Sequence, residues 1–223
     1  QDLLTSIYEN NVLTQNSSRD VLSKNTSGNV DVNVDYLRTF KPQQEWSIST
    51  QFSRNDLVNN FDADLFNGIG NLTGRQRNVN HSNNQEVTFQ TDYQTPIGKN
   101  QLIEFGGKGI FRTVLSDYKY LTAGPTGDFA TDAKNLTGSL DYSQNIAATY
   151  LSYTFQTKNK ITFKVGSRYE HTFINASTRE GGSLAIPDYS NLVPSLNISK
   201  SFSGKTLKLA YNRRIQRPGI QQL

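Results

Sequence analysis

Apolar and polar residues alternate along residues 161–173, which read ITFKVGSRYEHTF. Ile161, Phe163 and Val165 occupy one parity, whereas Lys164 and Arg168 occupy the other. A period of two predicts a β-strand, because successive side chains of a strand point to opposite faces of its sheet. The stretch is longer than the roughly 5–6 residues of an ordinary soluble strand. The pattern therefore predicts one long strand with an apolar face and a charged face.

The same alternation predicts about eight strands in all. The strands are separated by two kinds of connection, which alternate along the chain. Short connections at 41–44, 96–100, 158–160 and 203–205 contain the turn formers Pro, Gly, Asn and Lys, and long polar connections cover 54–84, 116–141 and 174–190. The other predicted strands lie at 30–40, 45–53, 86–95, 102–116, 147–157, 191–202 and 206–214.

Alternating short and long connections predict an all-β fold, an antiparallel up-and-down meander with two unlike ends. Transmembrane barrels of the outer membrane have this asymmetry, with short periplasmic turns and long extracellular loops. The predicted strand bodies also match the roughly 9–11 tilted residues that cross a bilayer. In this interpretation Ile161, Phe163 and Val165 face lipid. A soluble β-sandwich, with one buried face and one wet face, remains the alternative.

Aromatic residues are expected to form two rings at the two edges of the bilayer. Phe40, Trp46 and Tyr93 lie near the short turns, together with Tyr153, Phe155 and Phe202. The ring toward the long connections is expected to contain Tyr118, Tyr120, Tyr142, Tyr169 and Phe173.

Composition is compatible with such a barrel. Only 35% of the residues are hydrophobic and no run approaches 18 apolar residues, so no transmembrane helix is expected. The chain has no cysteine, which excludes disulfides and thiolate metal sites. Its net charge of +4 comes from scattered basic residues, so no nucleic-acid partner is expected.

Three stretches resemble TonB-dependent receptors of the Bacteroidetes. GSRYEHT at 166–172 resembles a G-x-R-Y-E strand of that family, and LVPSLNISKSF at 192–202 is similar to the strand that follows it. LKLAYNRRIQRPGIQQL at 207–223 resembles its Y-x-R-R-I-x-R-P segment. The resemblance covers residues 140–223 well and the earlier strands only by their pattern.

The resemblance implies a 22-stranded barrel in the bacterial outer membrane, of which residues 1–223 would be one segment without a plug domain. It also implies energised uptake of a scarce small solute. The implied partners are outer-membrane lipid, a plug domain and a TonB-type energy-coupling complex. No cofactor is expected. The alternative is a small structural or adhesive barrel, in which the strand near 26–40 would pair with the strand near 207–217.

Charged residues on the polar parity are expected to line the lumen and to face a plug or a solute. Most of them are basic, so closure into a narrow ring would bring like charges together. The candidates are Lys108, Arg112, Lys164, Arg168, Glu170, Lys208 and Arg214.

Other chemistry has little support in the sequence. No G-x-S-x-G pattern indicates a nucleophile, so an enzyme is not expected. Asp62, Asp64 and Asn67 resemble a calcium loop, but the Asn and Gly positions are displaced and no downstream Glu fits. A turn-rich surface loop is the favoured interpretation of these residues, which remain a weak candidate for a metal site.

Overall fold

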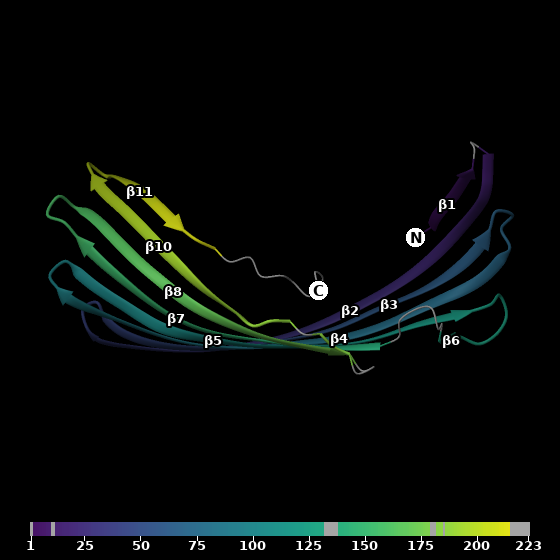
Figure 1. The fold of residues 1–223 in the computed structure, drawn as a ribbon, viewed down its shortest axis with the longest axis horizontal. Helices are drawn as coiled ribbons and strands as arrows, with labels where there is room; N and C mark the ends of the chain where they lie inside the picture. The colour runs from purple at the N-terminus through teal and green to yellow at the C-terminus, as the bar shows by residue number, and fades with distance from the viewer. Residues whose placement is uncertain (1, 10–11, 132–137, 179–181, 185, 215–223) are drawn as a thin grey trace.

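The computed structural model describes residues 2–9, 12–131, 138–178, 182–184 and 186–214, which form a single curved antiparallel sheet (Figure 1). Nine strands follow one another in the order of the chain, and two short strands pair at the side. The strands are β1 (Asp2–Glu9), β2 (Val12–Lys41), β3 (Gln44–Asn67), β4 (Leu72–Gly98), β5 (Gln101–Ala123), β6 (Ala130–Thr131), β7 (Gly138–Gln156), β8 (Ile161–Thr178), β9 (Ser183–Leu184), β10 (Tyr189–Phe202) and β11 (Lys205–Asn212).

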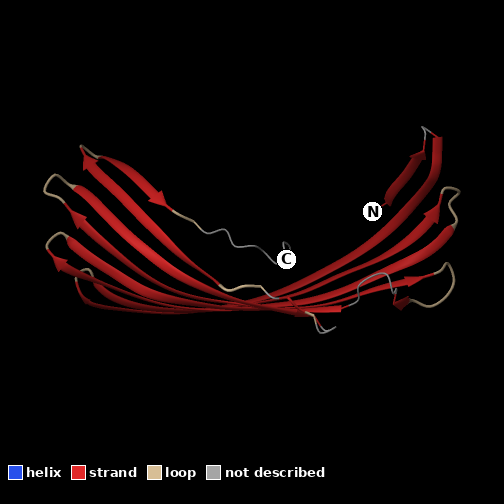
Figure 2. Cartoon of the chain, in the orientation of Figure 1, coloured by secondary structure: helices blue, strands red, loops and turns tan. Residues whose placement is uncertain are grey.

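The predicted meander is confirmed. Each long strand pairs antiparallel with the next long strand along the chain, while β6 pairs with β5 and β9 with β8 (Figure 2). The sequence prediction missed β1, β6 and β9, and it placed the start of β2 too late. No helix in the described part of the chain is long and apolar enough to cross a membrane.

The predicted long connections are largely wrong, because strands continue through most of them. β3 and β4 have 24 and 27 residues, and only residues 68–71 separate them. Residues 54–84 therefore form a paired ladder in place of a loop, with a register that continues from Arg54↔Gln85 to Asp64↔Arg75. The segment was misjudged because it is polar on both faces, although antiparallel pairing satisfies its backbone equally well without an apolar face.

The predicted connection at 174–190 is also wrong as an exposed loop. β8 continues to Thr178, and Ile186 and Tyr189 pack against a small apolar cluster on the sheet. The backbone N–H of Ile174 donates a hydrogen bond of 3.2 Å to the Asp188 carboxylate, which holds this segment against the strand. The cluster consists of Val114, Tyr142, Ile174 and Ala176, with Leu140 beside it.

The two faces of the sheet differ as predicted. The apolar face exposes large side chains such as Val32, Leu151 and Val165, each at least 50% accessible. Alternate residues of β7 and β8 on the opposite face are buried, and Glu170 and Thr172 are only 6% and 1% accessible. Side chains converge on the inner side of a curved sheet, so this polar face is the crowded, concave one.

The sheet is open in the described part of the chain. Residues 26–40 of β2 pair only with β3, and the described residues of β11 pair only with β10, so these two strands are not paired with each other. Figure 1 shows β1 and β11 at the two separate edges of the arc. Among the described residues, the pairing required by the small-barrel alternative is therefore not present.

Candidate functional site

Charged residues gather on the polar face in the half of the sheet next to the short turns. We call this half the band, comprising residues 30–41 of β2, 44–53 of β3, 86–98 of β4 and 101–112 of β5, with the strands paired beside them. The parts of the same four strands beyond the band, residues 20–29, 54–64, 75–85 and 113–123, are called the outer extension.

Arg112 lies at the edge of the band, between strands β4 and β7. Its Nε and Nη2 atoms lie 2.8 and 2.5 Å from Glu86 Oε2, and its Nη1 atom lies 3.4 Å from Gln144 Oε1. These contacts follow from the register, which places Glu86 and Gln144 directly opposite Arg112 on its two neighbours. An arginine held by a carboxylate and an amide is a fixed element of the wall.

Two further ion pairs lie nearer to the short turns. Lys164 Nζ is 2.5 Å from Glu104 Oε2, which also accepts a hydrogen bond of 2.9 Å from the Ser152 hydroxyl. Arg168 Nε is 2.5 Å from Glu170 Oε1, and this pair is the more buried one. The expected repulsion among basic side chains is therefore offset for Arg112, Lys164 and Arg168, each of which contacts a carboxylate.

Tyr150 lies across the backbone of β5 in the middle of this charged region. A Cβ atom on Gly106 would lie 2.5 Å from the Tyr150 hydroxyl oxygen and 2.5 Å from the Thr91 carbonyl oxygen, so only glycine fits beneath the ring. The Arg168 guanidinium lies 5.8 Å from the ring centroid, and Gln90 Nε2 donates to the hydroxyl over 3.4 Å. Tyr150 thus links strands β4, β5 and β8.

A hollow of about 470 Å³ lies on the polar face, with Tyr150, Ser152 and Lys164 in its lining. Its walls bring carboxylates of three strands toward the two basic side chains of β8. The charged lining consists of Glu45, Asp92, Glu104, Lys164 and Arg168. Such a surface can hold a plug or a hydrated solute through paired charges, and it contains both signs of charge.

The remaining predicted lumen residues are placed less uniformly. Lys108 lies on the polar face opposite Gln90 and Ala148, and Lys208 lies opposite Ser199 near the edge of the sheet. Arg214 lies beyond the end of β11, so strand alternation assigns it to neither face. Four of the predicted lumen residues therefore form ion pairs in the structure. Arg112 pairs with Glu86, Lys164 pairs with Glu104, and Arg168 and Glu170 pair with each other.

The sequence analysis missed the partners of these residues. Glu86, Glu104 and Gln144 have the correct parity, but only the register shows that they stand beside Arg112 and Lys164. Tyr150 was missed because the stretch 147–157 was read mainly for its apolar parity. The signal available in the sequence was a glycine in one strand, Gly106, that can pair with a tyrosine in the next, Tyr150.

The weak metal candidate is used differently in the structure. Asp62 and Asp64 lie within β3 and not in a loop, and Asp62 is 2.5 Å from Arg77 Nε. The Asn67 side chain accepts hydrogen bonds from the backbone N–H groups of Ile69 and Asn71, at 3.2 and 2.9 Å, and so stabilises the turn. Within the described residues, no group of three or more His, Cys, Asp or Glu side chains could hold a metal ion.

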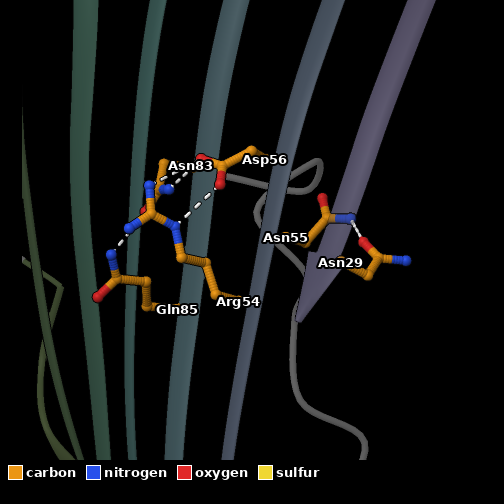
Figure 3. A network of polar contacts seen from close by, with 6 residues as sticks. All are labelled: Asn29, Arg54, Asn55, Asp56, Asn83 and Gln85. Carbon is orange, nitrogen blue, oxygen red and sulfur yellow. Dashed lines mark hydrogen bonds and ion pairs between the residues drawn. The ribbon is translucent and has the colours of Figure 1, made fainter. Parts of the chain in front are cut away.

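The apolar face changes character at Arg54, where the outer extension begins. Trp46, Ile48 and Phe52 precede Arg54 on this face of β3, and Asp56 follows it. Figure 3 shows Arg54 bonded to Asp56, with Asn83 and Gln85 beside them. Hydrogen bonds from Arg54 and Asn83 hold the pKa of the Asp56 carboxyl below its usual range. The apolar surface thus ends at a polar cluster.

Aromatic residues confirm one predicted ring and correct the other. Near the short turns, Phe40, Trp46, Tyr93 and Phe105 contact one another or their neighbours on the apolar face, with Tyr93 and Phe105 centroids 5.4 Å apart. At the other end, Tyr169 and Phe173 share that face. However, Tyr118, Tyr120 and Tyr142 lie on the polar face. Their cross-strand partners are Asn80, Asn78 and Val114, whose side chains point to that face.

Comparisons with solved structures find similarity to a transporter and to a receptor. The ferric citrate transporter FecA, in its unliganded form, is 12% identical with a TM-score of 0.45, over 87% of this chain and 35% of the transporter. BauA, the ferric preacinetobactin receptor from Acinetobacter baumannii, is 9% identical with a TM-score of 0.47, over 91% of this chain and 32% of the receptor. The chain thus spans about a third of the length of either protein.

A search of curated protein sequences finds no match. The sequence profile of the outer membrane protein beta-barrel family, by contrast, matches residues 38–223, which include every strand from β3 to β11. The match agrees with the meander, the apolar face and the unlike ends of the sheet, and it places the protein in the bacterial outer membrane. This chain belongs to the outer membrane protein beta-barrel family.

Proposed function

We propose that this chain forms an arc of the wall of a wide, TonB-dependent receptor barrel that takes up a scarce solute across the outer membrane. The observation that carries the proposal is the open, curved sheet with a charged and ion-paired polar face. An eight-stranded barrel has an interior just wide enough for side chains to fill. A wide barrel instead needs a wall whose inner face meets water or a plug domain.

The edges of the sheet support the same proposal. Unpaired backbone N–H and C=O groups within hydrocarbon cost several kcal/mol each. Within the band, residues 30–41 of β2 pair only with β3, and β11 pairs only with β10, so both strands need further strands beside them in the membrane. The motifs at 166–172, 192–202 and 207–223 resemble TonB-dependent receptors, in which further strands complete a 22-stranded barrel. A plug domain and a TonB-type energy-coupling complex would then act through the complete protein.

The test is a deletion of the gene that encodes the complete protein, followed by complementation. Mutant and complemented cells are grown with iron complexes, corrinoids or oligosaccharides as the limiting nutrient, and uptake of the limiting nutrient is measured with and without a protonophore. We expect the deletion to remove one uptake activity that the protonophore also removes. Loss of cell adhesion with all uptake activities intact would instead favour the structural or adhesive alternative.

A further inference from the structure

The polar face of the outer extension differs from the polar face of the band, because it carries no charged side chain. Charged residues make up 19% of the chain, and they are frequent on the polar face of the band. We call the uncharged surface the neutral wall. It consists of Val21, Ser23, Asn25, Ser27, Asn29, Asn55, Leu57, Asn59, Phe61, Ala63, Gln76, Asn78, Asn80, Ser82, Asn84, Val114, Ser116, Tyr118, Tyr120 and Thr122.

The register joins these residues into continuous rows across four strands. One row runs Asn29, Asn55, Asn84 and Val114, and another runs Asn25, Asn59, Asn80 and Tyr118. Asn29 and Asn55 are hydrogen-bonded to each other, as Figure 3 shows. Apart from Ala63 and Val114, the side chains of the wall are half-buried or exposed, so a solute inside the arc can reach them.

The opposite face of the same strands is rich in charge. Between the neutral positions the same strand segments place ten acidic and basic side chains, four of them in the ion pairs of Arg54 with Asp56 and of Asp62 with Arg77. The charged residues on this outward face are Asp20, Lys24, Arg54, Asp56, Asp62, Asp64, Arg75, Arg77, Asp117 and Lys119. The segments thus contain many charges, all of them on the outward face.

The side chains of the neutral wall have the chemistry of hydroxyl recognition. Asn and Gln side chains each offer donors and an acceptor, and Ser, Thr and Tyr hydroxyls offer both. Three aromatic rings stand among them, and Phe61 and Tyr120 meet edge to face with centroids 6.4 Å apart. An aromatic ring provides a flat apolar surface for the C–H face of a sugar. An ionic solute would lose hydration here without gaining a counter-charge.

The borders of the neutral wall are charged. Arg19 lies one row farther out on the same face, with its guanidinium 5.2 Å from the centroid of Phe61. Toward the band, the next row contains Asp31, Glu86 and Arg112. The neutral wall is therefore a bounded zone between two charged rims.

We infer that the neutral wall binds an uncharged, hydroxyl-rich solute, of the chemical class of a neutral oligosaccharide. The inference rests on the proposed uptake function and names its class of solute. A soluble saccharide is the occupant, and not the sugars of an outer-leaflet glycolipid, because the wall lies on the concave face of the sheet. Glycolipid would instead meet the charged outward face.

The experiment uses the complete protein, purified in detergent and also expressed in cells. Fluorescently labelled neutral oligosaccharides (dextrin, xylan and mannan fragments) are compared with oligogalacturonides of equal length and with ferric citrate. We expect at least one neutral probe to bind, and Asn59→Asp to weaken its binding by about tenfold or more because a carboxylate replaces a neutral amide among the solute's contacts.

The matched control is Asn60→Asp, which adds the same charge one residue away on the outward face, opposite Lys24. It should leave binding unchanged. Asn25→Asp and Thr26→Asp form a second matched pair on β2, where both side chains are exposed, in case the first pair disturbs assembly. If purified glycolipid competes with the neutral probe for binding, the wall recognises the sugars of a membrane lipid and not a soluble saccharide. This result would overturn the assignment.

The outcomes separate this inference from the proposed function. Energised uptake of a charged solute, with every neutral probe failing to bind, overturns the neutral wall and leaves transport intact. Binding of a neutral probe that Asn59→Asp weakens, without any energised uptake, supports the neutral wall and contradicts transport. Failure of all neutral probes to bind, or equal effects of Asn59→Asp and Asn60→Asp, also overturns the inference.

Discussion

The band and the outer extension carry their charges on opposite faces of the same strands. In the band the outward face is apolar except for Arg38 and Lys200 next to the short turns, and charged residues such as Arg112 and Lys164 lie on the concave face in ion pairs. In the outer extension the outward face is charged and the concave face is neutral. The side-chain alternation never changes along β3, so the surroundings of each face change at Arg54.

The physical reason for this exchange is the end of the hydrocarbon. A charge that faces the bilayer midplane costs about 2–4 kcal/mol, whereas the same side chain beyond the bilayer is hydrated or paired. The outward face can therefore carry charge only where it leaves the hydrocarbon. The concave face does not meet lipid in either region, so this cost does not apply to it. Its charges in the band, and the absence of charges in the outer extension, therefore reflect what the inside of the barrel contacts.

The largest expected effect tests which region lies outside the membrane. The chain contains no cysteine, so single cysteines can be introduced cleanly. In intact cells that express the complete protein, Ile69→Cys should react with a membrane-impermeant maleimide, because Ile69 lies in the turn between β3 and β4 and is 82% exposed. Lys158→Cys, in a short turn, should react only after the cells are permeabilised. The reverse labelling pattern would invert the proposed orientation.

A charge on the outward face should distinguish the two regions energetically. Val165→Arg, in the band, should cost about 2–4 kcal/mol and reduce the folded fraction in the outer membrane, as measured by heat-modifiable mobility of the complete protein. Val58→Arg, on the same face in the outer extension, should assemble normally. Thr162→Arg, on the polar face of the band, is the control for the direction of the side chain. Similar losses in all three variants would contradict the assignment of the faces.

The close approach of Tyr150 to β5 predicts a smaller effect. Gly106→Ala would place a methyl group 2.5 Å from two oxygen atoms, so we expect a loss of about 1–3 kcal/mol in the free energy of unfolding, measured by urea denaturation. Gly107→Ala is the control on the opposite face, where the nearest atom would lie at an ordinary 3.7 Å. Equal stability of the two variants would show that the position of the Tyr150 ring does not require a glycine at position 106.

The smallest expected effect concerns the ion pairs of the concave face. Lys164→Met should change the free energy of unfolding by roughly 0–1 kcal/mol, because this side chain and Glu104 are partly exposed and screened by solvent. Loss of Arg168 should cost more, because Glu170 is only 6% accessible and would lose its ion-pair partner. A larger loss for Lys164→Met than for Arg168→Met would contradict this order.

The sequence alone predicted the meander, the short turns and the face of each strand body, because these depend on local alternation and turn residues. It failed where polarity alone was taken to indicate loops. Residues 54–64 and 75–85 are polar on both faces, and only their mutual pairing shows them to be strands. It also placed Tyr118 and Tyr120 in an outer aromatic ring, although their parity relative to the sheet directs them inward.

What the sequence determined by itself was the direction of side chains relative to their chain neighbours, since a strand alternates with a period of two wherever it lies. The tertiary structure decided which residues from different strands share a row. Glu86 and Arg112, or Asn25, Asn59 and Asn80, are brought together only by the register. Register depends on hydrogen bonds and turn geometry between distant segments, and a shift of one residue would exchange the faces. The ion pairs of the band and the neutral wall therefore exist only in the assembled sheet.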